Sequence, residues 1–274
     1  MRQPATAYAY RVRRMAVVGA GFMGAQIAGW GARSGLEVTV YDADPGRAEA
    51  ARRQCESHGV EVETARELDQ ALDGADWIAE AVFEELELKR RVLAEIESEA
   101  PADAVISSNS SMIVPSLMSS VLQRPQRFLN VHFLPPVGSI PLVEVIPHPD
   151  TAEDAVGAVM RHIESSGLEP VLVRREIPGF IINNVLGALL SAGFLLVEEG
   201  AGTPEEIDHV ITRGLGHPIG PLRLADYIGL DTVLRASRAH REQTGLLPVS
   251  RLVEKMVAEG KLGMKAGEGF YKYS

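Results

Sequence analysis

The chain has one cysteine among its 274 residues, Cys55, which excludes an internal disulfide framework and indicates a reducing compartment. Basic residues are also few, with 27 Lys and Arg against 37 Asp and Glu and a net charge of −10. A nucleic-acid-binding protein would carry a basic stripe instead. The first 13 residues contain no apolar run of the kind that a secretory signal needs. These absences predict a cytoplasmic protein that does not bind nucleic acid.

Long uninterrupted apolar runs are missing too. The most apolar stretch, residues 180–197, contains Asn183, Asn184 and Ser191 and is followed by two glutamates. A membrane span tolerates such groups poorly, so the stretch favours a buried helix and no membrane contact is expected. No cysteines and histidines have the spacing of metal ligands, so no metal is predicted. What the chain does have is 46% apolar residues over more than one average domain length, which predicts two domains.

The pattern G-x-G-x-x-G follows a strand-like run at residues 14–18, and a helical stretch comes after it. The next strand-like run, 37–41, ends in Asp42. A Gly-rich turn of an ordinary α/β protein is the alternative, but strand, helix and acid together favour a dinucleotide site. There the glycines let backbone N–H groups approach a pyrophosphate at the helix N-terminus, and the acid accepts from the ribose. The predicted loop contacts are Gly19, Ala20, Gly21, Phe22, Met23 and Gly24.

Strand-like and helical stretches alternate up to residue 177, as a parallel sheet requires, and only helices are expected beyond it. We therefore predict an α/β, Rossmann-like dinucleotide-binding domain over residues 1–177 and an all-α domain over residues 178–274. Thr151 is expected to cap one helix, and Thr203 another through a capping box with Glu206. A further helical stretch is expected at 222–244. Strands are expected at residues 14–18, 37–41, 60–62, 76–82, 104–108, 128–133, 142–146 and 170–173.

Two of these strands carry His132 and Glu144 and are joined by a loop with three prolines. Prolines make the connection rigid, so we expect the two side chains to be held in a set relation. Taken separately, His132 is typical of a satisfied core histidine and Glu144 of an outward-facing strand residue. Together, beside a dinucleotide fold, they favour catalysis. A neutral imidazole can take the proton of an alcohol, and a carboxylate on its other nitrogen fixes the tautomer.

The chain resembles the L-3-hydroxyacyl-CoA dehydrogenase family over nearly its whole length. The resemblance implies NAD-dependent oxidation of a 3-hydroxyacyl thioester, such as 3-hydroxybutyryl-CoA, to the 3-oxoacyl form, or the reverse, in fatty acid metabolism. It also implies a homodimer through the C-terminal helices. The matching segments, in the family's order, are residues 19–24, Asp42, residues 80–84 with Lys89, and residues 108–111, 131–133, 141–145, 178–183, 214–231 and 265–271.

For single residues the resemblance implies two sets of roles. The family's catalytic histidine and glutamate fall on His132 and Glu144, and its serine and asparagine fall on Ser111 and Asn183. A hydroxyl and an amide N–H are suited to holding the reacting oxygen by hydrogen bonds. The family's contacts to NAD fall on Asp42, Glu84, Lys89, Ser111 and Lys265.

Two departures from the family keep the substrate open. Leu134-Pro135-Pro136 stands where the family usually has Phe-Asn-Pro after the histidine strand, and the Pro-Pro form resembles relatives that act on small free hydroxy acids. The segment between Asp42 and Glu80 is too short for the charged helical arm that helps hold CoA. The alternative substrates are therefore a 3-hydroxy acid on an acyl carrier protein and a small free 3-hydroxy acid. A catalytically silent NAD-binding protein is a third alternative, and the four intact catalytic positions argue against it.

Overall fold

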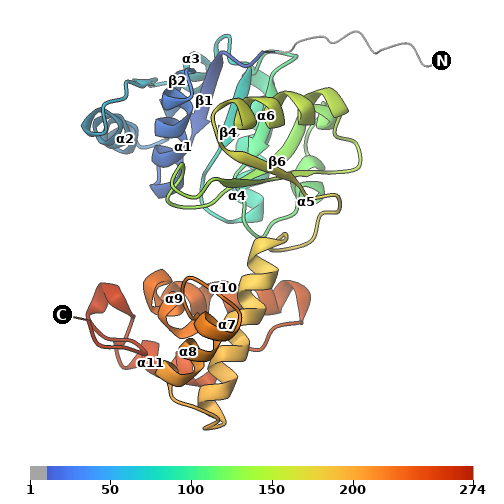
Figure 1. Ribbon diagram of the computed structural model, residues 1–274. Coiled ribbons are helices and arrows are strands. Elements are labelled where there is room, and N and C mark those ends of the chain that lie inside the picture. The colour runs from blue at the N-terminus through green and yellow to red at the C-terminus, as the bar shows by residue number, and fades with distance from the viewer. Residues whose placement is uncertain (1–10, 274) are drawn as a thin grey trace. The chain divides into compact units, whose positions relative to one another are not determined.

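The structure, a computed structural model, describes residues 11–273, and the chain divides into two compact units, Met1–Ile177 and Pro178–Ser274. We call them unit 1 and unit 2. The described part of unit 1 contains a sheet in the order β3-β2-β1-β4-β5-β6-β7-β8 (Figure 1). Its strands run parallel except for the antiparallel pair β6 and β7. The strands are β1 (Arg14–Val18), β2 (Glu37–Tyr41), β3 (Glu63–Thr64), β4 (Trp77–Glu80), β5 (Val105–Ser108), β6 (Phe128–Phe133), β7 (Leu142–Pro147) and β8 (Glu169–Leu172).

Helices cover both faces of this sheet, because successive side chains of a strand point to opposite sides. In β1, Met15 and Val17 join one buried cluster with α1, α2 and α6, whereas Ala16 and Val18 join a second cluster with α3, α4 and α5. The predicted α/β, Rossmann-like architecture is confirmed. The helices of unit 1 are α1 (Phe22–Arg33), α2 (Pro45–Ser57), α3 (Leu68–Leu72), α4 (Leu86–Glu99), α5 (Pro115–Ser119) and α6 (Glu153–Ser165), with a 3-10 turn at Pro125–Arg127.

The turn from β1 to α1 requires glycine for two different reasons. Gly19 has a φ of +102°, and a Cβ there would lie 2.8 Å from the backbone of Ala81, in the turn after β4. A Cβ at Gly24 would lie 1.8 Å from the carbonyl oxygen of Gly19, so α1 could not pack against the loop. At Gly21, by contrast, a Cβ would meet nothing within 4 Å. The middle glycine therefore borders open space, as the approach of a phosphate group requires.

Some local predictions were wrong. Thr151 does not cap α6: Ala152 occupies that position, while the Thr151 hydroxyl donates to the carbonyl of Phe128 and accepts from the N–H of His148. The third strand lies at Glu63–Thr64 and not at 60–62, because its partner in the register, Thr39–Val40, pairs with those two residues. The expected helical stretch 222–244 is interrupted at Gly229, whose φ of +97° is incompatible with a continuous helix.

Unit 2 is helical in its described residues. The predicted capping box at α8 is confirmed, since Thr203 accepts from the N–H of Glu206 and the Glu206 side chain accepts from the N–H of Thr203. A buried cluster that includes Leu190, Phe194 and Leu222 forms its core. No described helix is both long and apolar enough to cross a membrane. The helices are α7 (Ile182–Glu198), α8 (Pro204–Gly214), α9 (Pro221–Ile228), α10 (Leu230–Thr244) and α11 (Arg251–Ala258), with a 3-10 turn at Met264–Ala266.

Candidate active site

The structure brings Ser111, His132 and Glu144 together in unit 1. His132 lies on β6 directly opposite Glu144 on β7, because these residues are partners in the antiparallel register. The His132 Nδ1 atom lies 2.9 Å from a Glu144 carboxylate oxygen, and its Nε2 atom lies 3.1 Å from the Ser111 hydroxyl. The imidazole and the carboxylate are buried, with 4% and 1% of their residue surface exposed. Sheet pairing therefore fixes the relation that the sequence predicted from a rigid loop.

This arrangement assigns the tautomer of the neutral imidazole. An ionised carboxylate can only accept a hydrogen bond, so Nδ1 of His132 carries the proton that it donates to Glu144. Nε2 is then the unprotonated nitrogen, and the Ser111 hydroxyl donates to it. A hydroxyl on one side and a carboxylate on the other leave the imidazole positioned to accept a proton at Nε2.

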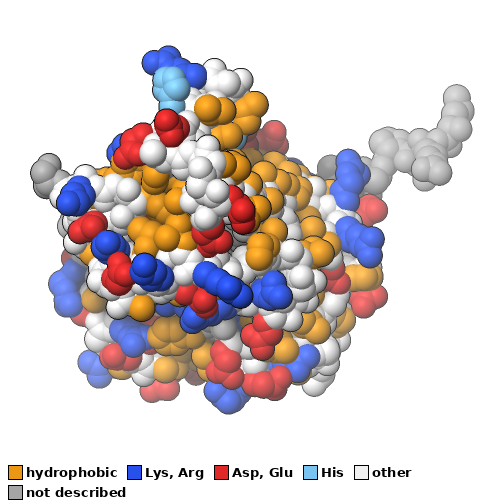
Figure 2. Space-filling model, turned by 90° about the horizontal axis from the view of Figure 1, so that it is seen from below, with side chains coloured by type: hydrophobic (Ala, Val, Ile, Leu, Met, Phe, Trp, Pro, Cys, Tyr) orange, Lys and Arg blue, Asp and Glu red, His pale blue; other side chains and the backbone are white. Residues whose placement is uncertain are grey.

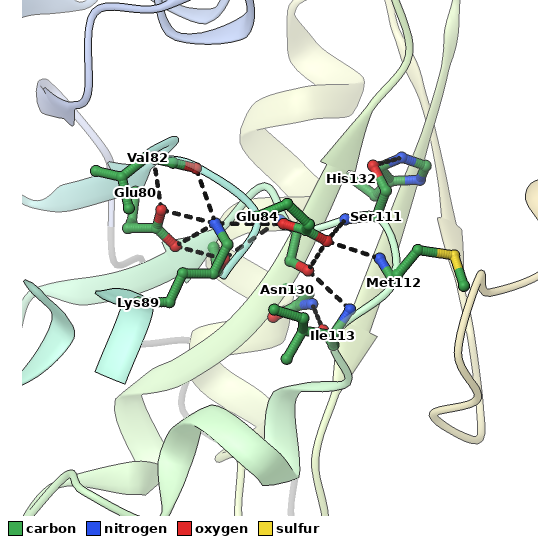
Figure 3. Close-up of polar contacts among 11 residues, drawn as sticks. Glu80, Val82, Glu84, Lys89, Ser111, Met112, Ile113, Asn130 and His132 are labelled. Carbon is green, nitrogen blue, oxygen red and sulfur yellow. Dashed lines mark hydrogen bonds and ion pairs between the residues drawn. The ribbon is translucent and has the colours of Figure 1, made fainter. Parts of the chain in front are cut away.

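Glu84 organises the loop that carries Ser111. It follows β4, and its Oε1 atom accepts from the Ser110 hydroxyl at 2.6 Å and from the N–H groups of Ser111 and Met112 at 2.9 Å each (Figure 3). Partial burial raises the pKa of this carboxyl, but the Lys89 ammonium and these hydrogen bonds outweigh it, and the pKa lies below its usual value. Glu84 is therefore ionised at neutral pH and acts as the acceptor for three donors of one loop.

Lys89 lies in the first two turns of α4 and is almost fully buried, with 1% of its side chain exposed. Its ammonium lies 2.8 and 3.1 Å from the two carboxylate oxygens of Glu80 and 3.2 Å from the carbonyl oxygen of Val82. The Glu84 carboxylate is the next acceptor, at 3.5 Å. Lys89 and Glu80 therefore form an ion pair that is buried from solvent at the carboxyl end of β4.

The glycine loop and Asp42 border a cavity of about 650 Å³, lined in part by Val18, Phe22 and Val82. The Asp42 carboxylate accepts from the N–H of Ala20 at 2.7 Å and from the N–H of Asp44 at 2.9 Å. It thus ties the loop after β2 to the loop after β1. The cavity, the open space at Gly21 and the N-terminus of α1 together fit a dinucleotide.

Asn183 and Lys265, the other two predicted site residues, belong to unit 2. Asn183 lies in the first turn of α7, where its N–H donates to the carbonyl of Gly179. The ammonium of Lys265 is paired with the carboxylate of Asp231 and is half exposed. The Lys265 side chain therefore has a charged partner in its own unit.

Two residues of the site were not predicted as such. Glu80 has no exposed surface, yet it accepts from Lys89, from the N–H of Val82 and from the Ser108 hydroxyl. Ser110 links Glu84 to the N–H of Ile113. One signal was available for Glu80: an acid at the end of a strand that is otherwise apolar must have a partner if the strand is buried.

Comparison with known proteins adds a family to this geometry. The model of the 3-hydroxyacyl-CoA dehydrogenase NAD-binding domain matches residues 14–62 and 56–177, and that of the C-terminal domain of the same enzymes matches residues 179–273. The chain is 36% identical to the 3-hydroxybutyryl-CoA dehydrogenase of Mycobacterium tuberculosis, over 96% of this chain and 99% of that protein. The crystal structure of (S)-3-hydroxybutyryl-CoA dehydrogenase PaaH1 from Ralstonia eutropha is similar with a TM-score of 0.83, at 32% identity, over 96% of this chain and 100% of that one.

The chain is also similar to a relative whose name gives a substrate other than an acyl-CoA. The chain is 32% identical to the 5-formyl-3-hydroxy-2-methylpyridine 4-carboxylate 5-dehydrogenase of Mesorhizobium japonicum, over 96% of this chain and 91% of that protein. The predicted family and the predicted cofactor are confirmed by the two matching domain models. The chain belongs to the 3-hydroxyacyl-CoA dehydrogenase family and is an NAD-dependent oxidoreductase.

Proposed function

We propose that this enzyme interconverts a 3-hydroxyacyl thioester and its 3-oxoacyl form, with 3-hydroxybutyryl-CoA as the representative substrate and His132 and Glu144 as the acid–base pair. The observation that carries the proposal is the position of His132 between the Glu144 carboxylate and the Ser111 hydroxyl, at 2.9 and 3.1 Å. The names of the relatives from Mycobacterium and Ralstonia support the substrate class.

In the oxidative direction, Nε2 of His132 takes the proton of the substrate hydroxyl, and Glu144 stabilises the imidazolium that forms. NAD, when bound, accepts the hydride from the same carbon. With substrate bound at Nε2, the single proton of the Ser111 hydroxyl is donated to the reacting oxygen in place of Nε2, and Asn183 is proposed as a second donor from unit 2. Glycine-loop N–H groups hold the pyrophosphate, and Asp42 receives the adenosine ribose. Glu84, Lys89 and Lys265 are the remaining proposed neighbours of the cofactor.

A substrate panel tests this proposal. NADH oxidation is followed with acetoacetyl-CoA, with a carrier-protein-bound acetoacetyl group and with small free 3-oxo acids. Replacing His132 with Gln should lower kcat by roughly two to four orders of magnitude while NADH binding is kept, because only general acid–base catalysis is lost. Near-native turnover by His132→Gln would assign the base to another residue.

The short segment between Asp42 and Glu80 favours a second candidate function. It contains only α2, β3 and α3, and the two segments that match the NAD-binding domain, 14–62 and 56–177, meet and overlap within it. A shorter segment offers fewer contacts to the CoA part of the substrate, and so less binding energy for orienting the thioester. A carrier-bound acyl group or a compact free acid does not need these contacts to CoA. The name of the Mesorhizobium relative indicates a free acid. A lower KM and higher kcat for one of these than for acetoacetyl-CoA would select it.

We also propose that the protein forms a homodimer through the helices of unit 2. Its helices expose large apolar side chains, among them Val185 and Leu195 of α7 and Val210 of α8, which are 62%, 54% and 63% exposed. Figure 2 shows hydrophobic side chains gathered between charged ones on the face that it draws. A second copy would remove this apolar area from water. Light scattering at micromolar concentration should give twice the chain mass, and a monomeric mass would contradict the proposal.

A further inference from the structure

Lys89 is the bulkiest charged side chain that is fully buried among the described residues of unit 1. Taking an ammonium out of water is unfavourable by several kcal/mol unless partners surround it. Here the three N–H groups of the ammonium face the two oxygens of Glu80 and the carbonyl oxygen of Val82. The protein therefore supplies acceptors for all its donors, and the buried position points to a task within the protein besides the proposed place beside the cofactor.

The two carboxylates around Lys89 hold the two ends of one loop. Glu80 accepts from the Ser108 hydroxyl at 2.6 Å, and the Ser108 hydroxyl oxygen accepts from the N–H of Ser110 at 3.2 Å. Glu84 accepts from Ser110, Ser111 and Met112 further along. Figure 3 shows Lys89 between the two carboxylates, with the loop on the far side of Glu84. The ammonium thus sets the position of both acceptors at once.

The loop ends at the proposed catalytic pair. The Glu84 carboxylate holds the Ser111 backbone by accepting a hydrogen bond from its N–H, and the Ser111 hydroxyl lies 3.1 Å from Nε2 of His132. A displacement of the carboxylate would move the Ser111 N–H with it, and a hydrogen bond weakens steeply beyond its normal length. Three successive contacts therefore connect the buried ammonium to the atom that exchanges the proton.

We infer that Lys89 is a positioning residue: through Glu80 and Glu84 its ammonium holds the loop of residues 108–112 so that the Ser111 hydroxyl meets His132. The inference rests on the proposed function for its kinetic consequence. Its geometric content, the Ser111–His132 contact, can be measured without turnover.

The charges around Glu84 predict how activity should depend on pH when Lys89 is removed. On α4 the facing charge is Lys89, on β4 it is Glu80 behind that ammonium, and beyond Ser111 lie His132 on β6 and Glu144 on β7. When Lys89 is removed, negative neighbours and partial burial remain, so the pKa of Glu84 rises. A protonated carboxyl cannot serve three donors at one oxygen. Activity should then be lost at the acid end of the pH profile.

The experiment compares Lys89→Met with Lys89→Arg, with Glu84→Gln and with the double variant Glu84→Gln/Lys89→Met. The matched control is Arg91→Met, which removes the same charge from an exposed position on α4. At saturating substrate, Lys89→Met should lower kcat roughly tenfold to a hundredfold, since small misplacements near the chemistry have effects of that size. The Kd of NADH should change by a smaller factor than kcat, Lys89→Arg should recover part of the rate, and Arg91→Met should match the wild type.

The pH profile separates positioning from a general loss of structure. Lys89→Met should lose activity toward acid pH, and the double variant should not, because a glutamine at residue 84 takes up no proton. Equal losses at every pH in both variants would overturn the inference. So would a raised NADH Kd with an unchanged kcat in Lys89→Met, which would leave Lys89 a neighbour of the cofactor without a positioning role.

A spectroscopic measurement keeps the inference testable apart from the proposed function. In neutral His132, the ¹⁵N resonance of Nε2 should move in Lys89→Met toward its position in Ser111→Ala, and it should not move in Arg91→Met. An unmoved resonance would refute the positioning role even if the wild type turned over none of the substrates tried. If Lys89→Met does not fold, the variant Glu80→Gln/Lys89→Gln leaves no unpaired buried charge and gives the same readouts.

Discussion

Glu84 in unit 1 and Asp226 in unit 2 perform the same task in different surroundings. Asp226 lies on α9, accepts from the N–H groups of Phe270 and Tyr271 at 2.9 Å each, and accepts from the Tyr273 hydroxyl at 3.0 Å. Each carboxylate therefore holds a distant stretch of chain through two backbone N–H groups and one hydroxyl. Glu84 keeps 41% of its side chain exposed and has Lys89 beside it, whereas Asp226 has no exposed surface.

The pKa values of the Glu84 and Asp226 carboxyl groups are shifted in opposite directions. Burial raises the pKa of Asp226 by more than its hydrogen bonds from Phe270, Tyr271 and Tyr273 and the charge of Arg223 lower it. For Glu84 the ammonium and the hydrogen bonds outweigh the partial burial, and the pKa is lowered. Equal numbers of donors do not decide the ionisation of a carboxyl group; the balance between burial and the nearest cation does.

The largest expected effect is the removal of the Asp226 carboxylate. Asp226→Ala leaves the N–H groups of Phe270 and Tyr271 and the Tyr273 hydroxyl without their acceptor. A buried donor left unsatisfied costs about 1–3 kcal/mol, so a loss of several kcal/mol in the stability of unit 2 is expected. Hydrogen exchange should show faster exchange at residues 270 and 271. Glu242→Ala, at an exposed position on α10, is the matched control, and equal protection in both variants would contradict this role.

The second effect is a contrast in pH dependence. A carboxyl whose pKa is raised by folding contributes stability at low pH that is lost as the pH rises from its unfolded value, 3.8, through the folded pKa. The advantage of the wild type over Asp226→Asn should therefore shrink as the pH rises. It is measured by hydrogen exchange at residues 270 and 271.

Glu84 should show the opposite slope. Its lowered pKa contributes stability that is present above the unfolded value, 4.5, and is lost as the pH falls through the folded pKa. The advantage of the wild type over Glu84→Gln should therefore shrink toward acid pH, by less than for Asp226, because solvent screens the exposed group. Both tryptophans, Trp30 and Trp77, lie in unit 1, so their fluorescence during urea unfolding reports on it. Slopes of one sign at both sites would break the comparison.

The smallest effect concerns the cation near Asp226. The Arg223 guanidinium lies 3.9 Å from the centre of the Tyr271 ring and is exposed. Arg223→Leu removes a cation–π contact worth about 0.5–1 kcal/mol at exposed sites and a charge that favours ionised Asp226. A slightly lower melting temperature for unit 2 is expected, with part of the loss restored in Arg223→Lys. A melting temperature equal to that of the wild type would show that Tyr271 is held by its other contacts alone.

The sequence by itself determined the architecture and the proposed chemistry. Alternation of strands and helices predicted the Rossmann-like sheet, and the glycine pattern with Asp42 predicted the dinucleotide site, because both depend on local periodicity and local turns. His132 and Glu144 were predicted as a pair from two adjacent strands. Helix and strand ends were less well predicted, as Thr151 and residues 60–62 show, because caps and short edge strands depend on what packs beside them.

Only the tertiary structure decided how the polar residues are paired. The sequence predicted Lys89 as a cofactor contact and did not predict its burial, which follows from the position of α4 against the end of β4 and places Glu80 and Glu84 around it. Asp226 and the segment of residues 270–273 are far apart in the chain, so their contact leaves no local pattern. Burial and charge at such sites depend on contacts between distant segments, and these determine which carboxyl groups are ionised.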